Sequence, residues 1–294
     1  MFKRALIASD LSPASTALIE CMGDLKSLNI DEVILFNALG FREPDTVSDI
    51  MIETVKPELM KQKTQLEEIG FNVTLEIATG IPSEEIKRVS KEKDVSFIVI
   101  GSHGESAFRH KLFRLGGVAS EVLNSHEKPL LFLRTNIPDQ DDLTITIGKG
   151  DNLAEMVLFA ADFADISMLA FEYVERLVED GTKNVTLLHV QDKTRIDNHL
   201  TDKLDEFNRI DQQRLELRKD RLIGKGAQRV DIKIPYGIPA QEILEESDKG
   251  YSLIVMGSQG RGFFHSIFIG SVSYKVARYA DISVMLVPAR IERR

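Results

Sequence analysis

The chain has 294 residues, about twice the usual size of one domain, so two domains are the first expectation and one large domain is the alternative. Its composition is 43% hydrophobic and 28% charged, as in an ordinary folded protein. The sequence contains no run of about 18 apolar residues, the length needed to cross a membrane. The formal net charge of -9 argues against a general nucleic-acid binder, which needs a basic face, but leaves room for a small anion held by backbone amides.

In chain order, short apolar runs alternate with longer amphipathic segments. The first half predicts strands at 4–9, 33–38, 72–78, 96–101 and 130–134. The second half predicts strands at 156–161, 184–190, 229–235, 252–257 and 283–287. Most of these runs are continuously apolar, which is typical of strands buried on both faces of a parallel sheet. The alternation of strands and helices therefore predicts an α/β fold with doubly wound, Rossmann-like sheets.

Two of the segments between the strands carry clear helix signals. Residues 14–28 follow Ser12-Pro13, and proline is favoured in the first turn of a helix. A longer charged helix is predicted to run to about residue 223, with apolar residues at helical spacing on one face. The residues that mark this face are Leu200, Leu204, Phe207 and Ile210.

The sequence also repeats itself. Three segments of the first half recur in the same order in the second half. They are 80–86 (GIPSEEI) with 237–243 (GIPAQEI), 97–104 (FIVIGSHG) with 253–260 (LIVMGSQG), and 8–10 (ASD) with 160–162 (AAD). Self-similarity over such long segments indicates two copies of one domain-sized unit.

The join between the copies is rich in turn-forming and acidic residues. We expect a first domain over 1–137, a linker over 138–154 and a second domain over 155–294. Within this join, residues 143–147 alternate between apolar and polar side chains. They could form an extra edge strand, and a solvated extended linker is the equal alternative.

The most specific local pattern lies in the second half. Gly257 and Gly260 follow a predicted strand, and Gly270 and Ser271 precede a helix predicted over 272–279. Glycines let the backbone turn tightly and approach a ligand without a Cβ in the way. Loop N–H groups and a helix N-terminus then present partial positive charge to an anion. The sequence therefore predicts a phosphate-binding loop, although no G-x-x-x-x-G-K-[ST] motif occurs and no G-x-G-x-x-G follows the first strand of either half.

This loop, with residues elsewhere in the same half, resembles the universal stress protein family. The family pattern G-x2-G-x9-G-[ST] after a fourth strand is matched by 257–271. The family also shows an Asp ending the first strand, a His-Val pair ending the second and a Gly-x-Pro after the third, matched by Asp162, His189-Val190 and 237–239. The resemblance covers nearly the whole chain as a tandem of two domains. It implies a five-stranded parallel sheet of order 3-2-1-4-5 in each domain, with ATP or AMP, with or without Mg²⁺, as the ligand.

By this resemblance the nucleotide lies in the second domain, between strands 1 and 4, where the strand order reverses. Adenine and ribose would be held by Asp162, Val190, Ile238 and Pro239. The phosphates would be surrounded by Gly257, Gly260, Arg261, Gly270, Ser271 and Ser273. The implied nucleotide-binding set is completed by Met256, Ser258 and Val272. Arg261 is added on charge grounds, and a solvated loop arginine is the equal alternative.

The first half keeps the base side of this pattern better than its phosphate side. Asp10 and Ser12 are retained, but Gly116 and Gly117 come later than the pattern requires and lack the serine. The basic residues between the glycines, which could offset the missing hydroxyl, are Arg109, His110, Lys111 and Arg114. We expect the nucleotide in the second domain, and weak binding, a monophosphate or no ligand in the first. The weaker site would consist of Asp10, Ser12, Ala38, Gly101, Gly104, Gly116 and Gly117.

The resemblance also implies how the domains associate. Stand-alone family members pair through their fifth strands, and segments 130–134 and 284–288 would otherwise be left as bare apolar edges. We expect these segments to pair within the chain as an internal pseudo-dimer, which could assemble further into a homodimer. Neither nucleic acid nor a membrane is expected as a partner.

Other chemistries find little support. The six histidines show no metal-ligand spacing, no G-x-S-x-G occurs, and Cys21 has no neighbouring His. The S-G-G-x-D-S and H-I-G-H loops of adenylating enzymes are also missing. We therefore expect a nucleotide-binding module with a regulatory or stress-response role, without catalytic residues or a metal; a slow ATPase and a ligand-free scaffold are the alternatives. The lone Cys21 and the early Asp10, which argues against a signal peptide, favour the cytoplasm.

Overall fold

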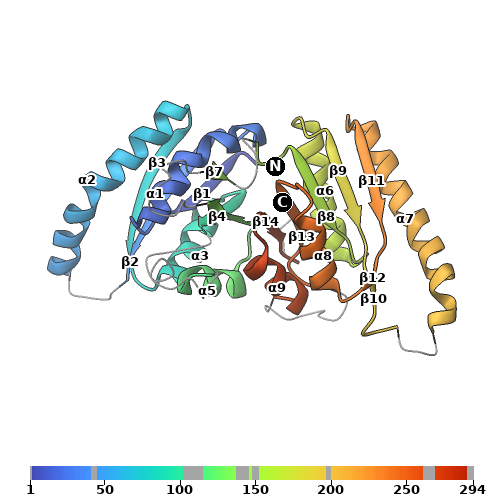
Figure 1. The fold of residues 1–294 in the computed structure, drawn as a ribbon. Coiled ribbons are helices and arrows are strands. Elements are labelled where there is room, and N and C mark those ends of the chain that lie inside the picture. Colours follow the sequence, from blue (N-terminus) through green and yellow to red (C-terminus); the bar gives the residue numbers. More distant parts are fainter. Residues whose placement is uncertain are drawn as a thin grey trace. The chain divides into compact units, whose positions relative to one another are not determined.

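The computed structural model describes residues 2–40, 45–101, 115–136, 146–147, 152–196, 200–260 and 269–289. These residues form two compact units, one within 1–151 and the other within 152–289. In Figure 1 the first unit runs from blue to green and the second from yellow-green to red. Both units are α/β domains, which confirms the predicted fold class.

The first unit contains a parallel sheet. Its strands are β1 (Arg4–Ala8), β2 (Glu32–Leu39), β3 (Asn72–Thr79), β4 (Phe97–Gly101) and β5 (Leu130–Leu133). Their hydrogen-bonded order is β5-β4-β1-β2-β3, and every pair is parallel. Leu6 and Ile7 of the central strand have no exposed surface, because apolar side chains on both faces of the strand are covered.

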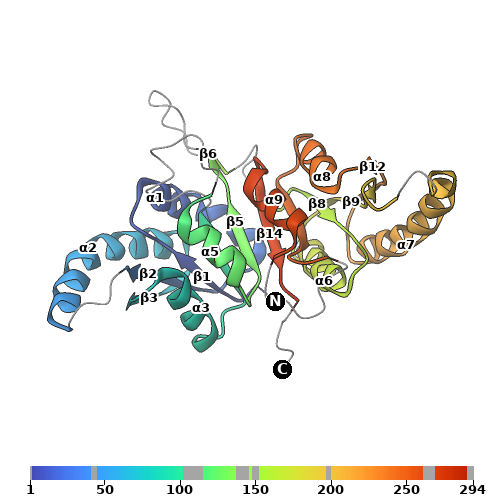
Figure 2. The same ribbon diagram turned by 90° about the horizontal axis from the view of Figure 1, so that it is seen from below.

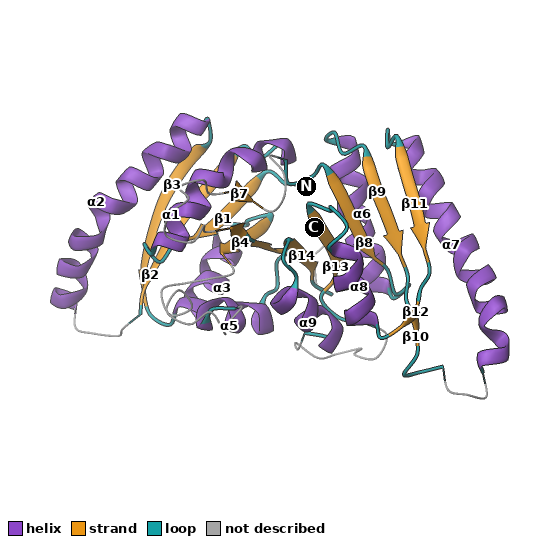
Figure 3. Ribbon diagram, viewed as in Figure 1, coloured by secondary structure: helices purple, strands orange, loops and turns teal. Residues whose placement is uncertain are grey.

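The second unit repeats this order. Its strands are β8 (Met156–Ala160), β9 (Asn184–Leu188), β11 (Arg229–Lys233), β13 (Leu253–Gly257) and β14 (Ser283–Val287). They are arranged as β14-β13-β8-β9-β11, again all parallel, and Figure 3 shows β8, β9 and β11 running in one direction. A small parallel ladder, β10 (Gln191–Asp192) with β12 (Tyr236–Gly237), follows the ends of β9 and β11. Both units thus have the predicted order 3-2-1-4-5.

Helices cover both faces of each sheet. The first unit has α1 (Pro13–Glu20), the 3-10 helix η1 (Cys21–Leu28), α2 (Asp45–Ile69), α3 (Pro82–Glu92) and α5 (Gly117–Ser125). The second has α6 (Asp165–Glu179), the 3-10 helix η2 (Thr201–Lys203), α7 (Leu204–Gly224), α8 (Pro239–Ser247) and α9 (Ser271–Tyr279). α1 packs on α2 and α3 on α5; likewise α6 packs on α7 and α8 on α9. Figure 2 shows α6 and α7 on the opposite side of β8 and β9 from α8 and α9.

The helix predicted over 14–28 is not uniform. It is α-helical to Glu20 and tightens into η1 from Cys21 onward. Gly23 lies in this second part, and glycine lowers helix stability by about 1 kcal/mol relative to alanine. The sequence therefore placed the segment correctly, but the helix type changes within it.

The apolar face predicted for the long charged helix is buried only in part, since Leu204 and Phe207 are half-buried. Ile210 is 36% exposed, and Leu200 lies before the helix and is 39% exposed. The buried side chains are instead Asp211, Leu215 and Leu222. The reason is that polar and charged groups make much of the contact between α7 and the rest of its unit, as described below.

A short ladder lies near the end of the first unit. β6 (Thr135–Asn136) pairs antiparallel with β7 (Thr146–Ile147). The extra strand predicted over 143–147 is therefore found in its last two residues, while 137–145 and 148–151 lie outside the described residues. The exact domain boundaries stay predictions.

Candidate functional site

A pocket of about 250 Å³ opens at the carboxyl ends of the strands in the second unit. β8 and β13 are neighbours there, at the point where the strand order reverses, and ligands of open α/β sheets bind at such points. The predicted residues that line this pocket are Asp162, Val190, Pro239, Met256, Gly257, Gly260, Gly270, Ser271, Val272 and Ser273. Segments far apart in the sequence are thus brought to one pocket, as the sequence predicted.

The turn after β8 holds Asp162 at the pocket. Its Oδ1 accepts a hydrogen bond from the Ala164 N–H at 3.0 Å, and its own N–H donates to Ser167 Oγ at 3.3 Å. Phe163 adopts a left-handed backbone with φ of 59°. For a residue other than glycine this costs of order 1–3 kcal/mol, and such strain persists where the surrounding structure enforces the turn. The carboxylate is therefore held in one orientation before any ligand arrives.

The first unit repeats this turn. Leu11 has φ of 60°, the Ser12 N–H donates to Asp10 Oδ1 at 3.1 Å, and the Asp10 N–H donates to Ser15 Oγ at 3.1 Å. Neither leucine nor phenylalanine favours the left-handed region, so no residue type marks this turn in the sequence. Both units therefore place one carboxylate at the end of their first strand by the same device.

The loop after β13 approaches the Asp162 turn closely. A Cβ on Gly260 would lie 2.9 Å from Asp162 Oδ2, and a Cβ on Gly257 would lie 2.9 Å from Ile166 Cγ2. At these distances a side chain at either position would force the neighbouring side chain to shift, and glycine avoids this. The loop glycines and the carboxylate therefore flank one crevice.

Hydrogen bonds tie this loop to the sheet and to α9. The Ser258 N–H donates to the Val287 carbonyl oxygen at 2.8 Å, and the Gly270 N–H donates to the Ser258 carbonyl oxygen at 2.8 Å. Ser273 Oγ donates to the Gly257 carbonyl oxygen at 2.8 Å. The hydroxyl proton of Ser273 is thus used in a hydrogen bond to the loop. Ser271, at the start of α9, has an exposed hydroxyl.

The N-terminus of α9 forms one wall of the pocket. Gly270 is its N-cap and offers no side-chain hydrogen bond to the first turn. The first N–H groups of a helix have no partner within the helix, and its N-terminus carries about half a positive charge. This wall is chemically suited to an anion.

The wall on the β9 side is different in character. Val190, Ile196, Pro239 and Ile243 give it an apolar surface beside polar residues of the same segment. A flat aromatic group would be buried well against such apolar side chains. The pocket thus joins an apolar surface to a helix N-terminus that is suited to an anion, with one carboxylate in the turn after β8.

Two of the predicted residues that the structure describes do not line the pocket. Ile238 precedes α8 and is 40% exposed, and Ser258 is buried in the loop. Arg261 lies outside the described residues. Their roles in binding stay predictions.

Several pocket residues were not predicted. They are His189, Gln191, Asp192, Arg195 and Gln259, together with apolar neighbours. His189 and Gln191 directly flank the predicted Val190, so their position after the second strand is the signal that could have identified them. Arg195 Nε lies 3.3 Å from Asp192 Oδ2 in the pocket lining. This ion pair forms across the turn after β10.

A second pocket, of about 280 Å³, occupies the equivalent place in the first unit. Asp10, Ala38, Gly101, Gly116 and Gly117 line it as predicted. Among the described residues, Ser12 is not part of the lining; it is the N-cap of α1, and its Oγ accepts a hydrogen bond from the Ser15 N–H at 3.2 Å. Gly104 lies outside the described residues, as do the four basic residues of the same loop.

The helix N-terminus of this pocket carries fewer hydroxyls. Gly117 is the first residue of α5, where Ser271 begins α9. Two residues on, Ala119 stands where Ser273 bonds the strand end in the second unit. Among the described residues, the helix start at the first pocket therefore has fewer hydroxyl donors, while the turn that holds the carboxylate is the same.

No helix in the described part of the chain has the length and apolar character needed to cross a bilayer. The described side chains also include no cluster of three or more His, Cys, Asp or Glu residues placed to hold a metal ion.

The fold and its two pockets define a tandem of doubly wound α/β domains with sites at their topological switch points. The profile of the universal stress protein family matches residues 1–134 and 155–288. The chain therefore belongs to the universal stress protein family, with one such domain in each half.

Individual relatives agree with this assignment. A universal stress protein of Methanocaldococcus jannaschii is 27% identical over 157 residues, which cover 46% of this chain and 96% of that protein. A universal stress protein of Mycolicibacterium smegmatis is 27% identical over 237 residues, 78% of this chain and 74% of that protein. The crystal structure of a universal stress protein from Archaeoglobus fulgidus has the same fold over 99% of this chain and 100% of that one, with a TM-score of 0.74 at 24% identity.

Proposed function

We propose that the chain is a regulatory, stress-response protein that binds an adenine nucleotide, ATP or AMP, in the pocket of the second unit. The observation that carries this proposal is the close approach of Gly260 to the Asp162 carboxylate, which brings the glycine loop and the strained turn to one pocket. A nucleotide needs three kinds of contact at once: an apolar surface for the base, an acceptor for the ribose hydroxyls and donors for the phosphates. This pocket offers all three.

Each part of the nucleotide has a chemical partner there. The Asp162 carboxylate accepts hydrogen bonds from ribose hydroxyls, as acidic residues do in other α/β nucleotide sites. Val190 and Pro239 cover the base. The loop amides, the α9 N-terminus and Ser271 donate to the phosphates. Mg²⁺ would accompany the phosphates of ATP.

The first pocket is proposed as a weaker site for the same class of ligand. It keeps Asp10 in the same turn but has Gly117 in place of a serine. Pairing of segments 130–134 and 284–288 within the chain, association into a homodimer and a cytoplasmic location stay predictions from the sequence.

The first test asks what the protein carries and which residues hold it. Purified protein is denatured, the polypeptide is removed, and any released nucleotide is identified by chromatography. ATP and AMP affinities are then compared between the wild type and Gly260→Val combined with Ser271→Ala. We expect a loss of several kcal/mol, at least about a hundredfold in affinity, because the valine fills the space beside Asp162 Oδ2 and a donor is lost.

Gly224→Val is the matched control, because a Cβ at the end of α7 meets nothing within 4 Å. This variant should bind like the wild type. Unchanged affinity in the double variant would exclude this loop as the phosphate site. Failure of the wild type to bind either nucleotide would contradict the proposed function.

A further inference from the structure

A buried polar bridge connects the second pocket to α7. His189 and Gln191 line the pocket, and both side chains meet Asp211 of α7. Gln191 Nε2 donates to Asp211 Oδ2 at 2.9 Å, and His189 Nε2 lies 3.4 Å from the same oxygen. Arg214, one turn further along α7, donates from Nη1 to Asp211 Oδ1 at 3.1 Å. His189, Gln191 and Asp211 are all buried, so these contacts are shielded from water.

The hydrogen bonds of His189 indicate its protonation state. Its Nδ1 lies 2.7 Å from the carbonyl oxygen of Ala161, which can only accept, so Nδ1 carries a proton. In a neutral ring the lone pair of Nε2 would then face the Asp211 carboxylate, which also only accepts. A protonated ring instead donates to both neighbours. The geometry therefore favours the imidazolium form of His189 when Asp211 is ionised.

The ring of Phe163 completes the surroundings of His189. The two ring centroids are 4.5 Å apart, and the guanidinium groups of Arg214 and Arg218 lie 5.1 and 4.8 Å from the Phe163 centroid. Among the described residues, charged groups face His189 from four elements. They are Asp211, Arg214 and Arg218 on α7, Asp162 after β8, and Asp192 and Arg195 in the β10 segment. The fourth element, β11, carries Lys233, which pairs with Glu246. The carboxylates favour a charged ring, and the arginines and burial oppose it. Asp211 is the group placed to decide the balance.

The first unit has uncharged side chains near the corresponding strand end. Asn37 follows β2 residue Phe36 as His189 follows β9 residue Leu188, and Asn37 Nδ2 donates to the Ser9 carbonyl oxygen at 2.8 Å. Gln62 Oε1 of α2 accepts from Ser9 Oγ at 2.8 Å. Asn37 and Gln62 are both buried, but Asn37 Oδ1 and Gln62 Nε2 have no hydrogen-bond partner among the described residues. The contact between a histidine and a carboxylate of the packed helix therefore has no counterpart at Asn37 and Gln62.

We propose that Asp211 is a positioning residue of the second pocket, which holds His189 protonated and oriented at the pocket and so gives this site a positive charge that depends on pH. Asp211 acts from α7 through His189 and Gln191. The first unit has the uncharged Asn37 and Gln62 near the corresponding strand end and should lack this response. For the ligand, the inference rests on the proposed function: a positive charge at the pocket strengthens binding of a phosphate-bearing anion, and its loss weakens it.

The charge of His189 is tested first without any ligand. The imidazole resonances of the full chain are titrated by NMR, and the His189 signal is identified by its absence in His189→Asn. In Asp211→Asn we expect the midpoint of the His189 titration to fall by about one pH unit or more, because the opposing carboxylate is gone. A midpoint that does not move would overturn the proposal. Circular dichroism verifies that the variant is folded.

The effect on binding is tested with ATP and AMP between about pH 5.5 and pH 8.5, a range that brackets a histidine titration. The variants are the wild type, Asp211→Asn, and His189→Asn combined with Asp211→Gln, which copies the neutral pair of the first unit. We expect the affinity of the wild type to fall about threefold to tenfold as His189 loses its proton. In Asp211→Asn this fall should occur at lower pH, and in the double variant it should be absent. A pH effect that is the same in all three proteins is attributed to ionisation of the nucleotide.

The outcomes separate this inference from the proposed function. A double variant that follows the wild-type pH profile would overturn the role of the bridge in binding. If the wild type binds neither nucleotide at any pH, the proposed function fails, and the NMR midpoint alone then decides whether Asp211 controls the charge of His189. Circular dichroism verifies that the double variant is folded.

Discussion

At the residue scale, His126 shows how burial turns one side chain into a pH-sensitive element of stability. It follows α5, with Nδ1 2.8 Å from the Leu123 carbonyl oxygen, and its Nε2 is buried with no hydrogen-bond partner among the described residues. Burial disfavours the charged ring and lowers the pKa of His126 from 6.5 to about 4, although the backbone contacts oppose this. The folded state therefore prefers the neutral ring.

This shift predicts that the first unit loses stability as the pH falls. Below about pH 6.5 the unfolded chain takes up a proton at His126, while the folded ring stays neutral until about pH 4. The free energy of unfolding should therefore decrease through this window and level off below it, by at most about 3 kcal/mol. Urea unfolding of the wild type and of His126→Asn across this range measures the difference. Parallel curves for the two proteins would contradict the prediction.

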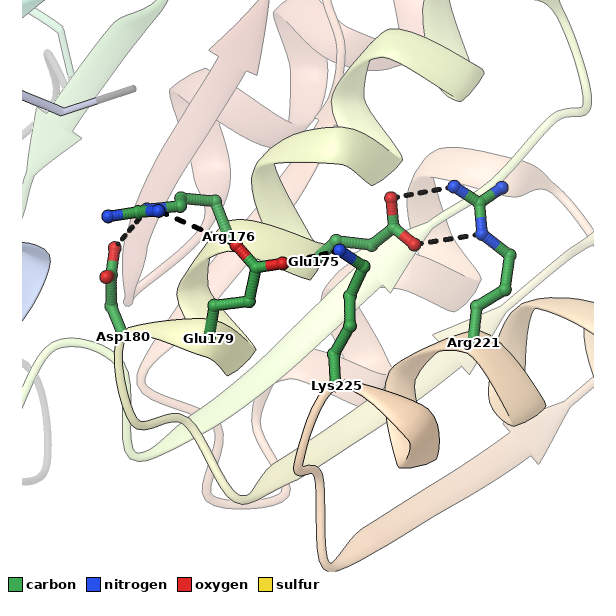
Figure 4. Close-up of polar contacts among 6 residues, drawn as sticks. All are labelled: Glu175, Arg176, Glu179, Asp180, Arg221 and Lys225. Carbon is green, nitrogen blue, oxygen red and sulfur yellow. Dashed lines mark hydrogen bonds and ion pairs between the residues drawn. The ribbon is translucent and has the colours of Figure 1, made fainter.

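At the scale of elements, α7 packs on its unit through two fully buried leucines, Leu215 and Leu222, together with ion pairs and arginine–aromatic contacts. Figure 4 shows Arg221 of α7 facing Glu175 of α6, with hydrogen bonds of 2.9 and 2.8 Å from Nε and Nη2. Arg221 also lies 5.3 Å from the Phe171 centroid. Glu175 is only 5% exposed, whereas the neighbouring pair of Lys225 and Glu179 is solvent-accessible on both sides.

The two pairs are therefore expected to differ in their contribution to stability. Arg221→Met leaves the buried Glu175 carboxylate without its bidentate partner, which should cost about 2–4 kcal/mol. Lys225→Met is the matched control and should change stability far less, because an exposed pair is screened by water. Denaturant unfolding followed by circular dichroism measures both. Equal effects would show that the Arg221 contact is no stronger than a surface pair.

The same element shows where prediction from sequence ends. The predicted strands were all found, because strands buried on both faces produce continuous apolar runs such as 283–287. The buried face of α7 was predicted only in part, because Asp211 is buried by partners that lie far away in the sequence. At the site, the glycines could be predicted because their spacing carries a backbone requirement, and Asp162 was indicated by the family resemblance. The position of His189 and Gln191 after the second strand was visible in the sequence, but their contacts with Asp211 were not, since these depend on which helix packs over the strand end.

At the scale of the whole molecule, one chain carries two pockets of the same topology and unequal chemistry. Both have the carboxylate turn, and both are formed at the point where strand order reverses. They differ at the start of the following helix, where Gly117 and Ala119 replace Ser271 and Ser273. A duplicated fold can in this way keep two pockets while only one has serine hydroxyls at the start of this helix.

This difference predicts the number of nucleotides bound and a way to change it. The wild type should bind one ATP tightly per chain. A Cβ on Gly117 meets nothing within 4 Å, so Gly117→Ser adds the missing hydroxyl without a clash. In a background with Gly260→Val and Ser271→Ala, where only the first pocket is intact, this serine should strengthen ATP binding by about tenfold, since a hydrogen bond to a charged group contributes roughly 1.5 kcal/mol or more.

Gly117→Ala is the control, because it removes the glycine at the helix start without adding a hydroxyl. If serine binds ATP no better than alanine in a calorimetric titration, the missing hydroxyl is not what weakens the first site.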